Sequence, residues 1–230
     1  MLGRLARVDQ RLPSAGPIVN AGGCDPLIWQ ALLPPAGEDL WVFGYGSLMW
    51  RPGFIFGECR PGRIHGFHRA LCVRSWVHRG TAECPGLVFG LDRGGSCVGR
   101  TFRVAAAEAE PVVRYLAARE MVTPVYRPLR VRVHTPGGRC RALVFVVDRC
   151  HPQYVRQPNA QQAAQIVCRA RGHSGPNIEY LLSTHQHLVE LGIQDPWLEA
   201  VCHQLDTATV TADQSPRSVP TPALRGRHQG

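Results

Sequence analysis

The pattern of apolar and polar positions predicts strands over the first two thirds of the chain's central region. "LWVFG" (Leu40–Gly44) is a short apolar run typical of a buried strand, and "RIHGFHRALCV" (Arg63–Val73) indicates a longer, half-exposed one. We expect a hairpin within Gly86–Val104, where "GLVFGL" and "CVGRTFRV" flank the turn "DRGGS". A second hairpin joins "YRPLRVRVHT" to "CRALVFVV" across "PGGR".

Helical periodicity dominates the rest of the domain. Asn159 is placed to cap "AQQAAQIVCRARG", and Gly172 suits a left-handed cap at its end. "SGPNIEYLLSTHQHLVELG" carries Pro176 in its first turn and closes at Gly192. Its expected apolar stripe is Ile178, Leu181, Leu182, Leu188 and Val189.

A last short helix is expected from Asp195–Pro196 to Leu205. Strands followed by helices, without a repeating βαβ unit, predict an α+β fold. The pattern also divides the chain into an N-terminal extension (residues 1–39, partly disordered), a working domain (40–205) and a disordered tail (206–230).

One helix interrupts the strands and carries a carboxylate in its apolar stripe. In "AAAEAEPVVRYLAAREMV", Val112, Leu116 and Glu120 are spaced at i, i+4 and i+8, so Glu120 faces the core. Burial raises the pKa of a carboxyl group toward the range useful for a general base. Arg119 points elsewhere on the helix and is not an obvious charge partner. A solvated surface charge is the alternative that spacing alone leaves open.

Composition limits the classes of partner. The net charge of +9 raises nucleic acid as a partner, but all 26 basic residues are arginine and they are spread through the predicted strands, loops and helices. The absence of lysine excludes a P-loop and Schiff-base chemistry. We therefore expect no nucleic-acid partner.

The nine cysteines are scattered singly, without a C-x-x-C pair, and are expected to be free, mostly buried thiols. Their spacing makes a zinc site improbable, and we expect neither a metal nor a cofactor. No apolar run approaches the roughly 20 residues that cross a bilayer, and no stretch has signal-peptide character. A cytoplasmic protein without a membrane partner is the expectation.

The stretch "VFGYGSLMWRP" (Val42–Pro52) leaves the first strand through two glycines around one aromatic residue. Such a turn makes a backbone nest that suits an anion or a carbonyl oxygen. Ser47 is not in a Gly-x-Ser-x-Gly setting, so a nucleophilic role for it is disfavoured. His185 and His187 lie on different helix faces, which disfavours a metal pair.

Four stretches in this order resemble the ChaC-type γ-glutamylcyclotransferases, which cleave glutathione. They are "WVFGYGSLMWRP", "HRGTAECPGL", "YLAAREMVTPVYRP" and "GHSGPNIEYL". The resemblance implies a mixed β-barrel-like sheet with flanking helices, and a carbon–nitrogen lyase without metal or cofactor. Its substrate would be glutathione. The α-amine of the γ-glutamyl group would attack the γ-carbonyl of the same molecule, and the products would be 5-oxoproline and cysteinylglycine.

The resemblance also implies roles for individual residues. Glu120 is the catalytic acid and base. The substrate-binding residues are Phe43, Gly44, Tyr45, Gly46, Ser47, Leu48 and Tyr154. His78, Arg79 and Gly80 match a further motif of unassigned role, and Met121–Tyr126 departs from the Gly-Gly-Tyr of some members, at the edge where the leaving amine would lie. Oligomeric state is not predicted.

Two other readings stay open. A cyclotransferase for other γ-glutamyl peptides or amines would share the same motifs, because the leaving group lies in variable surroundings. A non-catalytic protein that binds anions or nucleic acid is the alternative from another class, motivated by the charge of +9.

Overall fold

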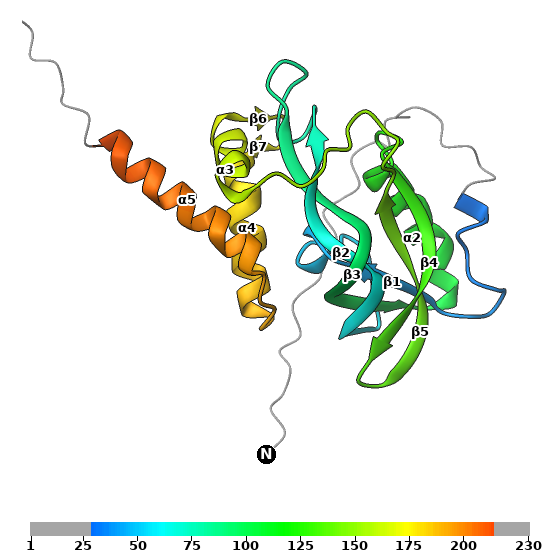
Figure 1. Ribbon diagram of the computed structural model, residues 1–230. Coiled ribbons are helices and arrows are strands. Elements are labelled where there is room, and N and C mark those ends of the chain that lie inside the picture. Colours follow the sequence, from blue (N-terminus) through cyan, green and yellow to red (C-terminus); the bar gives the residue numbers. More distant parts are fainter. Residues whose placement is uncertain (1–28, 214–230) are drawn as a thin grey trace, which may run out of the picture.

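A computed structural model describes residues 29–213, with side chains to residue 205. Its centre is a closed five-stranded barrel in the order β1-β3-β2-β4-β5 (Figure 1). The strands are β1 (Leu40–Gly44), β2 (Glu58–Ser75), β3 (Gly86–Val104), β4 (Tyr126–Thr135) and β5 (Gly138–Val147). β1 closes the barrel because it pairs antiparallel with β3 and parallel with β5. The expected α+β fold with a mixed, barrel-like sheet is confirmed.

The hairpin expected within Gly86–Val104 is wrong. This segment is one continuous strand, β3, that pairs with β2 from Ser75↔Gly86 to Glu58↔Arg103. "DRGGS" forms an irregularity between the pairs His65↔Ser96 and Phe67↔Arg93, and Gly94 and Gly95 adopt φ of 101° and 68° there. The glycines let the strand absorb extra residues and bend, because a long partner strand continues on both sides.

The second hairpin is confirmed. β4 and β5 pair along their whole length from Tyr126↔Val147 to Thr135↔Gly138, which leaves Pro136 and Gly137 as the connecting residues. Gly138 has a φ of 109°, a conformation that side-chain-bearing residues rarely adopt.

Short helical turns and one long helix connect the strands. η1 (Ser47–Met49) follows β1, and η2 (Ala106–Glu108) leads into α2 (Ala109–Glu120). Val112, Val113 and Leu116 of α2 pack with β1 and β3 residues in one core cluster. The predicted inward stripe of this helix is therefore confirmed.

The C-terminal elements are α3 (Ala160–Arg169), β6 (Arg171–Gly172), β7 (Gly175–Pro176), α4 (Asn177–Glu190) and α5 (Pro196–Asp213). Asn159 caps α3 as expected, because its side chain accepts a hydrogen bond from Gln162 N at 2.9 Å. The left-handed cap at Gly172 is wrong: α3 ends at Arg169, and Gly172 pairs with Gly175 in the two-stranded β6–β7 ladder.

The apolar stripe of α4 is only partly as expected. Leu181 and Leu188 are buried, whereas Leu182 and Val189 are 42% and 59% exposed. Two polar residues, Asn177 and Thr184, take places on the buried face because they satisfy their hydrogen bonds there.

The last helix is longer than expected. Asp195 accepts a hydrogen bond from Leu198 N at 3.1 Å and so caps α5, which continues to Asp213, past the expected end at Leu205. The expected extension up to residue 28 and the tail from residue 214 lie outside the described residues. No helix in the described range combines the length and apolar character needed to cross a bilayer.

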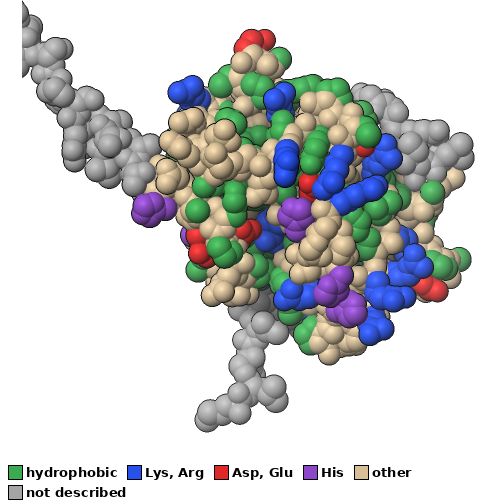
Figure 2. Space-filling model, in the orientation of Figure 1, with side chains coloured by type: hydrophobic (Ala, Val, Ile, Leu, Met, Phe, Trp, Pro, Cys, Tyr) green, Lys and Arg blue, Asp and Glu red, His purple; other side chains and the backbone are tan. Residues whose placement is uncertain are grey.

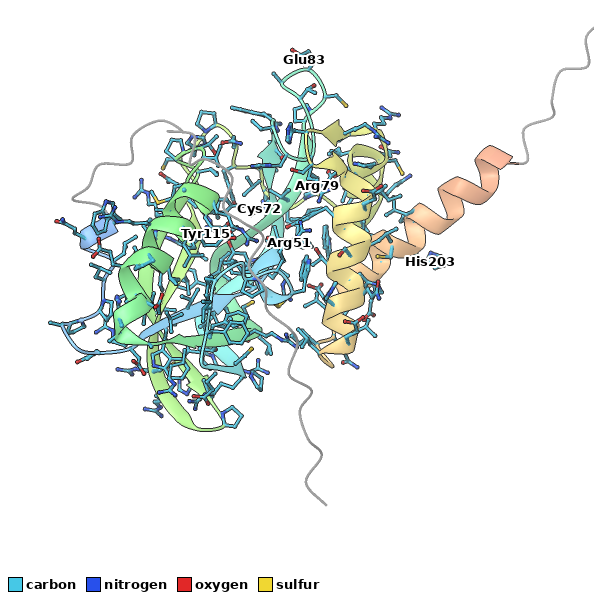
Figure 3. All side chains as sticks on the ribbon, turned by 180° about the vertical axis from the view of Figure 1, so that it is seen from behind. Arg51, Cys72, Arg79, Glu83, Tyr115 and His203 are labelled. Atoms are coloured by element: carbon cyan, nitrogen blue, oxygen red, sulfur yellow. The ribbon has the colours of Figure 1, made fainter. Side chains whose placement is uncertain are left out.

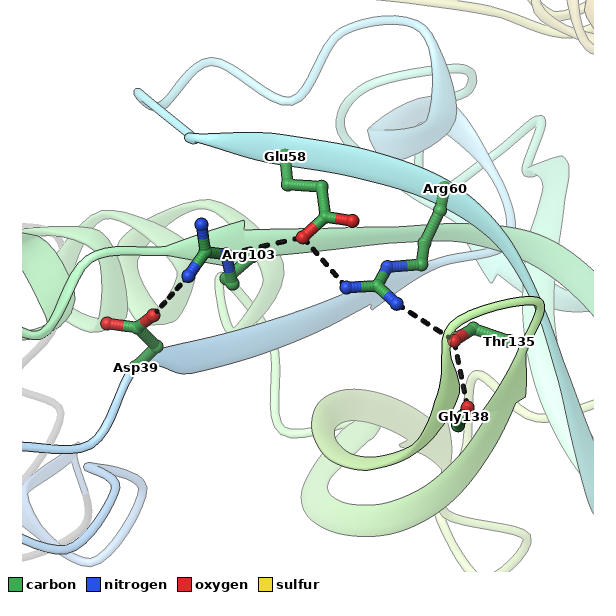
Figure 4. Close-up of polar contacts among 6 residues, drawn as sticks. All are labelled: Asp39, Glu58, Arg60, Arg103, Thr135 and Gly138. Carbon is green, nitrogen blue, oxygen red and sulfur yellow. Dashed lines mark hydrogen bonds and ion pairs between the residues drawn. The ribbon is translucent and has the colours of Figure 1, made fainter.

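The barrel lies between α2 on one side and α3, α4 and α5 on the other (Figures 1 and 3). On the face shown in Figure 2, arginine side chains lie more densely over the barrel than over the C-terminal helices. Several barrel arginines have acidic partners: Arg103 contacts Asp39 and Glu58, and Arg60 contacts Glu58 (Figure 4). Part of the positive charge is therefore neutralised within the barrel wall.

The cysteines of the described region form no disulfide, but they are not mostly buried. Cys72, Cys97 and Cys202 are buried, whereas Cys59, Cys84, Cys150 and Cys168 are exposed. The expectation of burial is therefore wrong for the exposed four. Cys24 lies outside the described residues.

Candidate active site

A cavity of about 510 Å³ opens between α2, the barrel and α4. Four segments line most of it: the loop after β1, the segment after β2, the end of α2, and the stretch that leads into β4. The residues that matter below are Tyr45, Gly46, Ser47, Leu48, Arg51, His78, Arg79, Tyr115, Arg119, Glu120, Tyr126, Gln153, Ser174 and Tyr180.

The predicted substrate loop supplies only part of its length to the cavity. Tyr45, Gly46, Ser47 and Leu48 line it, but Phe43 is fully buried in the barrel core. Gly44 lies beneath the loop, where a Cβ would come within 3.0 Å of Leu48 Cβ. Phe43 and Gly44 therefore support the loop from below.

η1 begins inside this loop. Met49 N bonds to Gly46 O at 2.9 Å, and Arg51 N bonds to Ser47 O at 2.9 Å. The first N–H groups of a helical turn have no acceptor within the turn, so those of Ser47 and Leu48 remain available to an anion or a carbonyl oxygen.

Glu120 is the last residue of α2 and lines the cavity. Its side chain is 19% exposed. Burial raises the pKa of the Glu120 carboxyl group, and the nearby Arg119 guanidinium opposes this shift. The spacing of the α2 stripe therefore located Glu120 correctly.

Arg119 is a charge partner of Glu120, although its place on the helix did not make it an obvious one. Its Nε lies 3.0 Å from Glu120 Oε1. Adjacent helix positions point in different directions, but the flexible arginine side chain curls back at the helix end, where Met121 leaves helical geometry. The expectation that Arg119 points away from Glu120 is wrong.

Arg119 also joins α2 to the substrate loop. Its Nη1 donates to the carbonyl oxygens of Arg51 (2.6 Å) and Pro52 (3.1 Å), and its Nη2 donates to Ser47 Oγ at 3.0 Å. One side chain thus fixes the loop relative to Glu120. The sequence carried no signal for this role beyond the position of Arg119 next to Glu120.

Three tyrosines line the cavity: Tyr45 is buried, and Tyr126 and Tyr180 are partly buried. The Tyr45 hydroxyl donates to Phe145 O at 2.8 Å, the Tyr126 hydroxyl donates to Phe89 O at 2.9 Å, and the Tyr180 hydroxyl accepts from Phe89 N at 3.1 Å. Burial raises the pKa of Tyr45 and Tyr126 well above the ordinary value and that of Tyr180 to about 12. These phenols stay neutral at physiological pH.

Tyr154 does not line the cavity. Its hydroxyl donates to Asp92 Oδ2 at 3.1 Å, and Asp92 also receives the Arg149 guanidinium at 2.6 Å. Its neighbour Gln153 lines the cavity instead and donates through Nε2 to Arg74 O at 2.7 Å. Tyr154, expected to bind substrate, lies outside the lining of this cavity, because a turn of the chain after β5 directs it toward this ion pair.

The His78-Arg79-Gly80 motif forms part of the wall of the cavity. His78 Nδ1 lies 3.0 Å from Ser174 Oγ, and Arg79 Nη1 donates to Pro176 O at 3.1 Å. Burial lowers the pKa of His78, and His173, Arg79 and Arg119 lower it further. A neutral imidazole is therefore favoured at this wall.

The two disfavoured chemistries gain no support from the geometry. Ser47 Oγ accepts from Arg119, and no histidine bonds to it among the described side chains. His187 stacks on Trp50 with ring centroids 4.7 Å apart, and its Nδ1 lies 2.7 Å from Ser183 O. In the described range, no group of three or more His, Cys, Asp or Glu residues is arranged to hold a metal ion.

The fold and site together define a barrel protein of the γ-glutamylcyclotransferase class. A crystal structure of a γ-glutamylcyclotransferase specific to glutathione from yeast superposes with a TM-score of 0.67 at 22% identity, over 74% of this chain and 96% of that one. A family model described as "ChaC-like protein" matches residues 40–208. The chain belongs to this ChaC family.

Curated relatives agree with the family match. The chain is 40% identical over 165 residues to the glutathione-specific γ-glutamylcyclotransferase of Escherichia coli K12, covering 71% of each protein. It is 33% identical over 177 residues to the mouse glutathione-specific γ-glutamylcyclotransferase 1, covering 74% of this chain and 79% of the relative.

Proposed function

We propose that this protein is a γ-glutamylcyclotransferase, a carbon–nitrogen lyase that cleaves glutathione to 5-oxoproline and cysteinylglycine. The observation that carries the proposal is Glu120, a carboxyl group of raised pKa that lines the cavity beside the Tyr45–Leu48 loop. The glutathione-specific relatives from Escherichia coli and mouse support the choice of substrate.

The reaction is intramolecular. The α-amine nitrogen of the γ-glutamyl group attacks its own γ-carbonyl carbon, a new carbon–nitrogen bond closes the ring of 5-oxoproline, and the bond to the cysteine nitrogen breaks. Because both reacting groups belong to one flexible chain, the protein's main task is to hold that chain in its attack geometry. This chemistry requires no metal, nucleotide or covalent intermediate.

Glu120 moves the proton in this scheme. Its carboxylate accepts a proton from the attacking amine and returns it to the leaving nitrogen of cysteinylglycine, so no net proton is consumed. A carboxyl group with a raised pKa suits both halves of this transfer. Arg119 opposes the rise and so keeps the carboxylate available as a base.

The Tyr45–Leu48 loop is proposed to hold the γ-glutamyl group. Backbone N–H groups at the start of η1 bind either the α-carboxylate or the oxygen that gains charge during attack. Phe43 and Gly44 contribute by supporting this loop, and the Arg119 bond to Ser47 Oγ fixes it. Tyr154 is not part of the proposed site.

We also propose that the protein acts in the cytoplasm on this small molecule, without a nucleic-acid or membrane partner. Glutathione keeps thiols reduced in the cytosol, and cysteines that form no disulfide in the described region suit that compartment.

The test is to incubate the purified protein with glutathione and measure 5-oxoproline and cysteinylglycine together. We expect equal amounts of both products from the native protein and a loss of rate of about 10²- to 10⁴-fold in Glu120→Gln. Glu110→Gln is the matched control, because Glu110 lies on the same helix and pairs with Arg114 in solvent.

Intact glutathione after incubation with the native protein would contradict this substrate. The same assay with other γ-glutamyl peptides and amines then tests the broader cyclotransferase reading. Full activity of Glu120→Gln would contradict the role of Glu120.

A further inference from the structure

The arginines that line the cavity outnumber its one acidic lining residue, Glu120. Glu120 is paired with Arg119, and three further arginines, Arg51, Arg74 and Arg79, line the same cavity. None of these three has an Asp or Glu within ion-pair distance among the described side chains. Arg51 and Arg79 lie in the region between α2 and α4 (Figure 3).

Arg79 is held in place although it lacks an acidic partner. Its backbone N–H donates to Ser75 Oγ at 3.0 Å, and its Nη1 donates to Pro176 O at 3.1 Å. Its guanidinium carbon lies 5.6 Å from the centroid of the Tyr180 ring. These contacts occupy few of its five N–H donors, so a fixed cation with spare donors faces the cavity.

Backbone packing makes the neighbourhood of Arg79 stiff. A Cβ at Gly80 would collide with Gly86 N, and a Cβ at Gly172 would come within 2.6 Å of the His78 carbonyl group. The segment after β2 therefore lies directly against the β6–β7 turn. A cation fixed in this way loses little conformational entropy when an anion binds.

Tyr180 connects this cation to the proposed reaction centre. Its ring lies beneath Arg79, and the charge of Glu120 raises the pKa of its hydroxyl group while that of Arg79 lowers it. Arg79 and Glu120 thus both act on one side chain of the cavity wall. Glu120, Tyr180 and Arg79 all line one cavity, so the path that we propose for a substrate with its scissile carbonyl at Glu120 runs past Tyr180 to Arg79.

We propose that Arg79 binds the C-terminal carboxylate of the leaving dipeptide and so selects substrates that end in a free carboxylate beyond the cysteine. The inference rests on the proposed function. The glycine carboxylate of glutathione lies two residues beyond the scissile bond, about 7 Å along an extended chain. A planar guanidinium is suited to a carboxylate because it offers paired donors.

The test compares glutathione with its C-terminal amide, which removes only this charge. With the native protein we expect kcat/KM to be about 10- to 100-fold lower for the amide, mainly through KM, because a charged hydrogen bond is lost. Arg79→Gln should lose about the same factor on glutathione and change little on the amide. Retained turnover of the amide also shows that the variant is folded.

Two further variants sharpen the comparison. Arg132→Gln, an exposed arginine on β4, is the matched control and should leave both rates unchanged. Arg51→Gln should retain the preference for the free carboxylate. If Arg51→Gln abolishes that preference while Arg79→Gln keeps it, the carboxylate binds Arg51 and the assignment is wrong.

Other outcomes also decide the matter. Equal turnover of glutathione and its amide by the native protein would show that the carboxylate is not recognised. An equal loss on both substrates in Arg79→Gln would assign Arg79 a purely structural role. Failure of the native protein to form 5-oxoproline from either compound would instead overturn the proposed function on which the inference rests.

Discussion

Arg119 Nε lies 3.0 Å from Glu120 Oε1, although the two residues are adjacent on α2, where successive side chains point about 100° apart. The same guanidinium also contacts Ser47 Oγ and the Arg51 carbonyl oxygen. One arginine therefore sets both the charge state of the proposed base and the position of the proposed substrate loop.

Replacing Arg119 by Gln should move the acid limb of the pH–rate profile to higher pH. Arg119 lowers the pKa of Glu120, so its removal raises that pKa further, and Glu120 must be deprotonated to accept the amine proton. Loss of the loop contacts should also reduce kcat/KM by about 10- to 100-fold.

The measurement is kcat/KM for glutathione across the acid range, with Arg114→Gln as control because Arg114 forms an exposed pair with Glu110 on the same helix. If the acid limb of the profile does not move in Arg119→Gln, then Arg119 does not influence the titration of Glu120.

Glu120→Gln should increase thermal stability at neutral pH, because burial raises the folded-state pKa of this acid above its unfolded value. The ionised carboxylate is then disfavoured in the folded protein at any pH above the folded pKa. Below the unfolded pKa the carboxyl group is protonated in both states, and the difference between variant and native protein should vanish.

Melting curves of both proteins at neutral and acid pH check this. A variant that melts below the native protein at neutral pH would mean that the ion pair with Arg119 outweighs the cost of burial.

The Ser47→Ala variant tests whether Ser47 supports the substrate loop or acts as a nucleophile. Ser47 Oγ accepts one hydrogen bond, from Arg119, so its removal should reduce kcat/KM by no more than about tenfold. A serine that attacked the substrate would lose about 10⁴-fold or more on the same change. Steady-state kinetics with glutathione distinguish the two, and a loss of the larger size would reinstate Ser47 as a nucleophile.

Leu116→Ala should destabilise the protein by about 2–5 kcal/mol, because Leu116 is fully buried where α2 packs on the barrel. Leu182→Ala on α4 is the matched control: Leu182 is 42% exposed, and its truncation should change the free energy of unfolding by about 0.5 kcal/mol or less. Urea unfolding monitored by tryptophan fluorescence gives both values. Similar losses for the two variants would contradict this packing of α2.

The pattern of apolar and polar residues was sufficient to predict features that depend on a single strand, hairpin or helix. Side-chain periodicity predicts the strand Leu40–Gly44, the β4–β5 hairpin and the inward stripe of α2. All three are present in the structure as predicted. Glu120 was located in this way, because a charge at the i+8 position of an apolar stripe is visible in the sequence alone.

Non-local contacts decided the features that pattern could not predict. β3 resembles two strands and a turn until its long pairing with β2 is known, since that pairing makes a bend more favourable than a reversal. The direction of the Arg119 side chain depends on carbonyl groups supplied by Arg51 and Pro52. Tyr154 lies close in sequence to cavity residues, but its hydroxyl group is held by Asp92.

The double pairing of β1 has a consequence for hydrogen exchange. Trp41 and Val42 pair with β3 on one side and with β5 on the other, and the proposed substrate loop begins directly after this strand. Amide protons of β1 exchange only when the barrel opens, so their protection should approach that of global unfolding. We therefore expect the loop to be attached to one of the slowest-exchanging strands, so that the floor of the proposed site persists as long as the barrel stays closed.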